Sequence, residues 1–267
     1  MKQFIKKWLG PLLIIVTLAI VIIVGMVNGT LPEAVKAVAH ANPLFMILCV
    51  ACYLAYLLCN AAGVKSFLKR EGFDLKWKDS FLASLTGIYY SNITPGATGG
   101  QPMQIYKLTR FGIPTGIATS AVASCFIAWH LMRVVLVTAL GIPYWGFITY
   151  NMGSYWPFLL LGYTYNVLLV ALWLVFSFSK KPVEWIARFL SWLARKLPFI
   201  KNTEKTQEGI ARTADKFHTS MQHLRYHKGE IFRQLVLGGL YMMMLVSILY
   251  FAYRGVGLSG TTYGQIT

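Results

Sequence analysis

The stretch SNITPGATGGQPMQIYKL, residues 91–108, places glycines, prolines and uncharged polar residues directly after an apolar run. That run, residues 81–90, is too short to cross a bilayer, because a membrane-spanning helix needs about 20 apolar residues. The stretch is therefore either a surface loop or a broken segment held inside a membrane, and the rest of the chain bears on the choice.

The composition of the whole chain is that of a membrane protein. Of its 267 residues, 56% are hydrophobic and 13% are charged, whereas soluble domains carry about 25% charged residues. Apolar windows long enough to span a bilayer lie near residues 8–27, 43–62, 117–140, 156–178 and 235–253. The sequence therefore predicts an all-α integral membrane protein, a polytopic helical bundle forming a single membrane domain over residues 1–267.

The distribution of positive charge predicts the orientation of these spans. If the spans alternate in direction, 22 of the 25 lysines and arginines fall on one side, Lys36 and Arg254 fall on the other, and Arg133 lies within a span. Because positive charge collects on the cytoplasmic side, the amino terminus is expected in the cytoplasm. The net charge of +16 is then a topology signal, and nucleic acid is not expected as a partner of this chain.

The same charge pattern requires residues 80–110 to begin and end on the cytoplasmic side. A helix that begins near Ser80 has to end before Pro95, because the residue before a proline disfavours helix, and a second helix can begin at Pro102. Non-helical backbone is tolerated at membrane depth only where protein or a water-filled cavity surrounds it. We therefore predict a Gly/Pro-broken re-entrant hairpin over residues 80–110, with an interfacial loop as the alternative.

A basic segment, residues 180–230, is predicted to lie on the cytoplasmic side. Its first part gathers apolar residues on one helical face, as interfacial helices do: Ile186, Phe189, Leu190, Leu193 and Leu197. Its second part repeats them at spacings of three and four, which predicts packing on the protein's own surface: Ile210, Ala214, Phe217, Met221 and Leu224. His223 and His227 are one turn apart without a third ligand, so a solvated helix face is expected rather than a metal site.

Patterns of catalysis and cofactor binding are missing from the sequence. It has no Walker loop, no dinucleotide-binding glycine fingerprint, and neither an HExxH nor a GxSxG motif. The nine carboxylates are all expected outside the spans, which argues against a proton relay inside the membrane. Cys49 and Cys52 form a CxxC pair within an apolar span and are interpreted as small core residues. We therefore expect no catalytic residues, no metal and no cofactor.

The span near residues 117–140 has two unusual features. Small residues repeat every four positions and let another helix approach closely: Gly116, Ser120, Ser124 and Ala128. His130 and Arg133 follow, one turn apart, and a charge within a span is costly and by default a functional candidate. This pair is a candidate for holding a lipid phosphate. The alternative is that Arg133 extends to the headgroups of the outer leaflet.

The run TPGATGGQPMQIYKL, residues 94–108, with RFGIP behind it at 110–114, resembles a signature of the transmembrane, flippase-like domain of the lysylphosphatidylglycerol synthase family, also called multiple peptide resistance factor. Small stand-alone members from Gram-positive bacteria are the most similar in appearance. The resemblance implies a bundle with re-entrant hairpins in the bacterial inner membrane. It also implies translocation of anionic or aminoacylated phospholipid, such as lysyl-phosphatidylglycerol, and a contribution to resistance against cationic antimicrobial peptides; a homo-oligomer stays open.

Two other functions stay open beside lipid translocation. The family name suggests a phosphatidylglycerol lysyltransferase that uses lysyl-tRNA, but the soluble domain that performs this transfer in full synthases is not found in these residues. The other is a lipid-binding scaffold without transport. Many members carry an acidic–basic pair where this chain has WHLMR at 129–133, and a second hairpin late in the chain. The sequence stops before such a hairpin, so it is expected to be the front part of a longer protein.

The candidate lipid-binding residues lie in two places. In the motif, glycines that leave N–H groups uncovered and the amino end of a helix favour a phosphate, with neutral donors at the tip and cations farther along. These residues are Thr94, Pro95, Gly96, Thr98, Gly99, Gly100, Gln101, Lys107 and Arg110, and the later span adds His130 and Arg133. The alternative is a structural hairpin whose glycines only allow close packing. If the motif is a cradle, Gly100→Ala is expected to be mild for folding.

Overall fold

The computed structural model describes residues 19, 22–196, 203–260 and 263. These residues form ten α-helices, two short 3-10 helices and no strand: α2 (Thr30–Ala39), α3 (Pro43–Arg70), α4 (Trp77–Ile93), η1 (Pro95–Ala97), α5 (Gly100–Arg110), α6 (Thr115–Gly141), α7 (Trp145–Met152), η2 (Gly153–Tyr155), α8 (Trp156–Phe178), α9 (Lys180–Lys196), α10 (Thr203–Tyr226) and α11 (Lys228–Gly255).

Four helical segments of the described chain are long and apolar enough to cross a membrane: Pro43–Arg70, Thr115–Gly141, Trp145–Val175 and Lys228–Gly255. The prediction of an all-α membrane protein is confirmed. The predicted span near residues 8–27 falls largely outside the described residues.

The chain divides into two compact units, one made of Met1–Ala51 and Ser247–Thr267 and the other of Cys52–Val246. In the first unit the backbone N–H of Asn42 donates to the carbonyl of Gly255 at 2.9 Å, and the rings of Phe45 and Phe251 lie 6.3 Å apart. Helix α2 has no buried residue. The second unit contains every candidate site residue.

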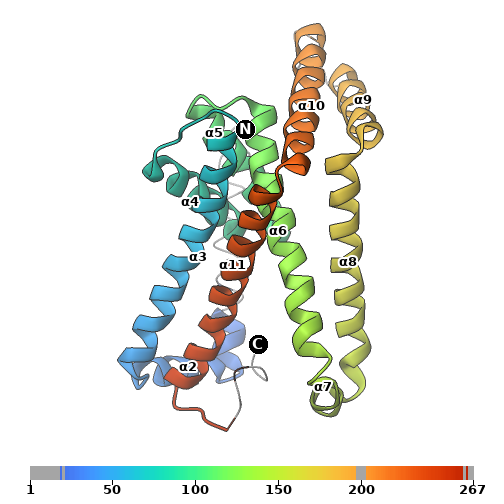
Figure 1. Ribbon diagram of the computed structural model, residues 1–267. Coiled ribbons are helices and arrows are strands. Elements are labelled where there is room, and N and C mark those ends of the chain that lie inside the picture. The colour runs from blue at the N-terminus through green and yellow to red at the C-terminus, as the bar shows by residue number, and fades with distance from the viewer. Residues whose placement is uncertain (1–18, 20–21, 197–202, 261–262, 264–267) are drawn as a thin grey trace, which may run out of the picture. The chain divides into compact units, whose positions relative to one another are not determined.

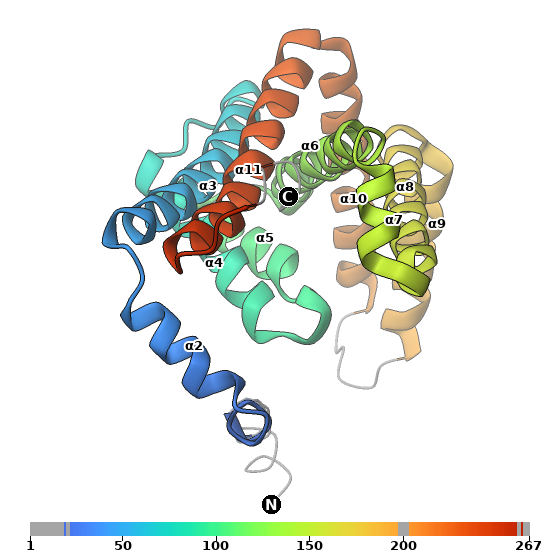
Figure 2. The same cartoon turned by 90° about the horizontal axis from the view of Figure 1, so that it is seen from below.

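Within the second unit, α3 and α11 run antiparallel. Gln234 Nε2 donates to the carbonyl of Gly63 at 2.9 Å, and farther along the same pair of helices the hydroxyl of Tyr241 donates to that of Tyr56 at 2.8 Å. Figure 2 shows the two helices side by side in the view along the bundle. Since hydroxyl and amide groups in an apolar bundle need partners, these bonds hold α3 and α11 in register.

Helix α6 is the neighbour of both α8 and α11. It runs antiparallel to α8, because Thr138 bonds Tyr163 at 2.7 Å while Phe126 contacts the ring of Trp173 near the other end. Against α11 it runs parallel, as the contacts from Cys125 to Gln234 and from Trp129 to Tyr241 show. Helices α6 and α11 therefore point one way and α3 and α8 the other (Figure 1).

Small residues let the helices approach. A Cβ atom at Gly116 would lie 2.7 Å from the carbonyl of Thr213 on α10, and one at Gly238 would lie 2.9 Å from the backbone of Ala128. Ser120 adds a hydrogen bond to the carbonyl of Phe217 at 3.2 Å. The small-residue face of α6 is thus used within the chain, where it receives α10 and α11.

The hydrophobic core of this unit lies where α3, the α4–α5 pair, α6 and α10 meet. Its fully buried members include Phe67 and Leu68 from α3, Ala83 from α4, Leu108 from α5 and Met221 from α10. Because Met221 and Leu224 of α10 are buried in this core, α10 packs on the protein itself.

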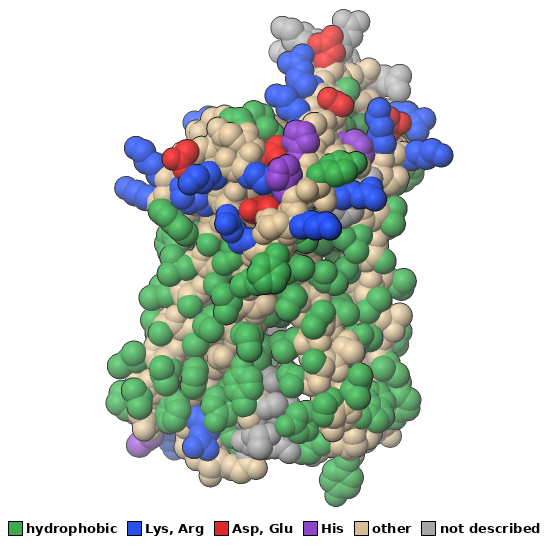
Figure 3. Space-filling model, viewed as in Figure 1, with side chains coloured by type: hydrophobic (Ala, Val, Ile, Leu, Met, Phe, Trp, Pro, Cys, Tyr) green, Lys and Arg blue, Asp and Glu red, His purple; other side chains and the backbone are tan. Residues whose placement is uncertain are grey.

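Apart from Arg133 on α6, the charged residues of the second unit gather at one end. In Figure 3 the lysines and arginines form a band at the end where α9 and α10 lie, and the side chains beyond it are mostly hydrophobic. Helix α7 lies at the opposite end (Figure 1). Helix α9 exposes an aromatic row in which Phe189 stacks on Trp185 at 6.1 Å and on Trp192 at 5.8 Å. The structure does not describe the side chains of residues 193–196, Leu193 among them, or any part of Leu197.

Candidate functional site

The motif folds as two helices with a short break between them. Helix α4 ends at Ile93, the 3-10 turn Pro95–Ala97 follows, and α5 begins at Gly100. Gly96 and Ala97 take φ angles of 63° and 56°, so the chain reverses through two residues in the left-handed region. Ala97 is the one non-glycine residue with positive φ in the described chain. Residues with a Cβ atom rarely adopt this left-handed conformation, so it persists only where the surrounding structure imposes it.

Thr94 holds the break closed from inside. Its hydroxyl donates to the carbonyl of Tyr90 at 2.6 Å and accepts from the backbone N–H of Gly99 at 2.9 Å. Residues 95–98 are exposed, and the hydroxyl of Thr98 donates to the carbonyl of Pro95 at 3.0 Å. Gly99, the N-cap residue of α5, has no side chain of its own, and Thr94 is the side chain that bonds its N–H. The exposed residues 95–98 thus lie next to the positive end of the dipole of α5, which begins at the buried Gly100.

Gly100 lies in the interface between α4 and α5. A Cβ atom built there would lie 1.9 Å from Ser91 Oγ and 2.8 Å from the carbonyl oxygen of Gly87. The expectation that Gly100→Ala is mild for folding is therefore wrong, because the substituted methyl group would meet backbone as well as a side chain. Gly99 is crowded in the same way by Thr94. These two glycines serve close packing, whatever else the tip does.

Gln104 is a site residue that the sequence analysis missed. It is buried, and its amide Nε2 donates to Asn60 Oδ1 on α3 at 3.1 Å and lies 3.5 Å from Ser84 Oγ on α4. Gly87 makes room for it, since a Cβ there would lie 2.9 Å from Gln104 Oε1. The spacing in the sequence could have indicated this, because Gly100, Gln104 and Leu108 are four residues apart and so share one face of a helix. In the structure all three are buried.

The basic residues of the motif lie away from the tip. Lys107 and Arg110 are in the last turn of α5, about 10–15 Å along the helix from its first residue at 1.5 Å per residue. The Lys107 ammonium lies 5.2 Å from the ring centre of Phe111. The structure therefore does not gather these two cations around Thr94–Gln101.

His130 and Arg133 lie on α6, where they contact aromatic rings. His130 is buried with its ring 4.2 Å from that of Phe126, and its Nδ1 has no hydrogen-bond partner among the described residues. The guanidinium of Arg133 lies 5.8 Å from the ring centre of Trp129. In the described chain, no hydrogen bond or ion pair joins either residue to the tip. They form a second, separate location.

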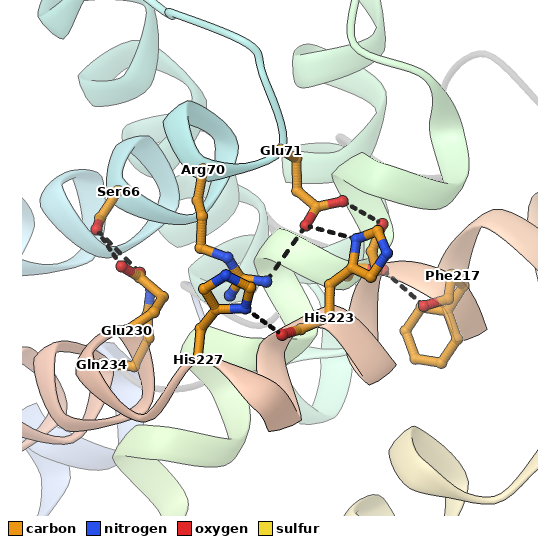
Figure 4. A network of polar contacts seen from close by, with 10 residues as sticks. Ser66, Arg70, Glu71, Phe217, His223, His227, Glu230 and Gln234 are labelled. Atoms are coloured by element: carbon orange, nitrogen blue, oxygen red, sulfur yellow. Dashed lines mark hydrogen bonds and ion pairs between the residues drawn. The ribbon is translucent and has the colours of Figure 1, made fainter.

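A buried polar network links α3 to the beginning of α11 (Figure 4). Glu230, 7% exposed, lies 2.9 Å from Ser66 Oγ and accepts from Gln234 Nε2 at 3.0 Å. Arg233 donates to Ser66 Oγ at 2.9 Å and lies 3.6 Å from Glu230. Glu230 is thus buried, which its place in a basic stretch of sequence did not indicate. It lies in the first turn of α11, where acidic residues are favourable.

A second carboxylate, Glu71, follows the end of α3; its side chain is 8% exposed and contacts α10. Its Oε2 accepts from the hydroxyl of Ser220 at 2.7 Å, and its Oε1 lies 3.7 Å from His223 Nδ1 and 3.7 Å from Arg70 (Figure 4). His227 instead bonds the carbonyl of His223. The described residues contain no group of three His, Cys, Asp or Glu side chains placed to hold a metal ion.

The ammonium group of Lys65 bonds the loop between α3 and α4. It donates to Asp74 Oδ1 at 3.1 Å and to the carbonyl of Leu75, and its ammonium lies 5.9 Å from the ring of Trp77. This hydrogen bond and the nearby positive charge hold the pKa of the Asp74 carboxyl below its usual value. The charge of Lys65 therefore stabilises the loop and is not free for an anionic ligand.

The comparisons with known proteins now bear on this arrangement. The model of the family described as "Lysylphosphatidylglycerol synthase TM region" matches residues 8–267. The chain belongs to this family. The resemblance drawn from the motif is thereby confirmed.

One relative of this chain is the UPF0104 membrane protein MJ1595 of Methanocaldococcus jannaschii. The two are 25% identical over 240 residues, which cover 84% of this chain and 65% of the relative. The chain thus spans about two thirds of the length of the curated relative that it matches. No solved structure matches it.

Proposed function

We propose that the chain binds the phosphate of anionic phospholipid at the tip of the α4–α5 hairpin and moves such lipid between the leaflets of the membrane. The observation that carries the proposal is the exposed tip, residues 95–98, which lies next to the N terminus of α5 and stands on a buried base. Helix N termini bind phosphate through free N–H groups and the helix dipole. Neutral donors suit a site that has to enter an apolar environment without a buried charge.

The buried base supports this role because it fixes the tip. Thr94 closes the turn, Gly100 packs on α4, and Gln104 bonds Asn60 of α3. In a re-entrant arrangement, non-helical backbone has to be surrounded by protein or by a wet cavity, and Thr94 within the hairpin already supplies a partner for the N–H of Gly99. His130 and Arg133 offer a second anion-binding location on α6, farther along the proposed lipid path.

The test places a negative charge at the tip. Thr98→Glu puts a carboxylate next to the α5 N terminus, where it competes with a lipid phosphate. The variant should still fold, because a negative charge near a helix N terminus stabilises the helix by about 0.3–1 kcal/mol. Thr98→Gln is the matched neutral control. In proteoliposomes with a leaflet-resolved assay of fluorescent phosphatidylglycerol, we expect Thr98→Glu to slow translocation several-fold and Thr98→Gln to leave it near the parent rate.

The outcomes separate the competing functions. Equal rates for Thr98→Glu and Thr98→Gln would contradict a phosphate site at the tip. Binding of phosphatidylglycerol by the parent chain without any exchange between leaflets would favour a lipid-binding scaffold. Transfer of lysine from lysyl-tRNA to lipid by this chain would favour the transferase suggested by the family name.

A further inference from the structure

A small, partly open cavity lies between α3, α6 and α11 of the Cys52–Val246 unit. Its volume is about 20 Å³. It is lined by Cys59, Asn60, Gly63, Cys125, Trp129, Gln234, Leu237, Gly238 and Tyr241. One water molecule needs about 10–15 Å³ measured in this way, so the space admits a single water.

One of the lining residues, Trp129, has an unused hydrogen-bond donor. The indole Nε1 of Trp129 is buried and has no hydrogen-bond partner among the described residues. Indole N–H groups only donate, and a buried donor without an acceptor is unfavourable. A partner with an oxygen atom within the cavity would satisfy it.

The other polar groups on the wall leave acceptor capacity for such a partner. Asn60 Oδ1 accepts one bond, from Gln104, and Gln234 Oε1 accepts one, from the thiol of Cys125. The hydroxyl of Tyr241 donates to Tyr56 and can accept in turn. Carbonyl and hydroxyl oxygens have two lone pairs, so each of these atoms can take a further donor. Apolar cavities stay dry, whereas polar ones with several partners hold ordered water.

We propose that this cavity is a binding site for one ordered water molecule, which accepts from Trp129 Nε1 and donates to the amide oxygens of Asn60 and Gln234. The water connects two networks that are otherwise separate. One contains Gln234, Glu230 and Ser66, and the other contains Asn60 and Gln104. Polar contacts then run from the first turn of α11 to the hairpin helix α5. This inference concerns the bundle interior and does not depend on lipid translocation.

The test is hydroxyl-radical footprinting of the full chain in lipid nanodiscs, with radicals produced from water by X-ray pulses and products read by mass spectrometry. Tyr241 lines the cavity and is 3% exposed, and Met242 is its neighbour on α11, 5% exposed and not part of the wall. A bound water generates radicals beside Tyr241. We therefore expect Tyr241 to be labelled several-fold faster than Met242, although methionine oxidises readily.

A cavity-filling variant provides the second measurement. A Cβ at Gly63 would lie 2.9 Å from Cys125 Sγ and 3.1 Å from Gln234 Oε1, both side-chain ends that can shift. Gly63→Ala should lower the labelling of Tyr241 to that of Met242, and Gly162→Ala, a glycine with no atom within 4 Å of its added Cβ, should not. Tyr241 labelled as slowly as Met242 in the parent chain, or labelling that Gly63→Ala leaves unchanged, would overturn the proposal.

Discussion

Gly100 shows how a single residue decides the shape of the hairpin. Its missing side chain lets α5 touch Ser91 and the backbone of Gly87. Gly100→Ala is expected to lower the free energy of unfolding by about 1–3 kcal/mol, as overpacking does. Gly162→Ala on α8 is the matched control, since its methyl group meets nothing within 4 Å and alanine stabilises a helix interior by about 0.5–1 kcal/mol over glycine. Thermal unfolding in micelles should thus shift in opposite directions, and a shift of both variants in the same direction would contradict this packing.

At the scale of the element, α10 is held on the bundle by apolar burial and by Glu71. Met221 is fully buried, and Ser220, 3% exposed, donates to Glu71 at 2.7 Å. Glu71→Ala leaves the Ser220 hydroxyl without its acceptor, which should weaken the docking of α10 by about 1.5–3 kcal/mol. Hydrogen exchange should then rise in the amides of 206–226 while those of α6 change little. Glu71→Gln keeps an acceptor oxygen and should have a smaller effect; equal exchange in the Ala variant and the parent would show that Glu71 does not hold α10.

At the scale of the whole molecule, the orientation in the membrane is the property to test. Tyr150 on α7 and Tyr226 at the end of α10 are 87% and 77% exposed, and the charge pattern predicts the first outside the cell and the second inside. With a membrane-impermeant maleimide, Tyr150→Cys should react in intact cells and Tyr226→Cys only after permeabilisation. The parent chain, with its four native cysteines, gives the background. Reaction of Tyr226→Cys in intact cells would reverse the predicted topology.

The sequence by itself determined the class of the protein and the places where its helices break. Apolar windows of about 20 residues can satisfy their backbone in a bilayer only as helices, so hydropathy alone was enough to predict the four long apolar helical segments that the described chain forms. Pro95 and the glycines around it marked the break between α4 and α5 for an equally local reason, since they restrict or free φ regardless of the surroundings. The motif also indicated the family.

Only the tertiary structure decided which polar residues are buried and what they contact. Glu230 looked like one more cytoplasmic charge in a basic segment, yet it is buried and bonds Ser66 of α3, which is far away in the sequence, as well as Gln234 on its own helix. In the sequence, Gln104 is one polar residue among several, and only the structure shows that Asn60 and Gly87 lie beside it. Lys107, close to the tip in sequence, lies at the other end of α5. Burial and partnership of a polar group depend on contacts between distant segments, and periodicity within one segment does not contain that information.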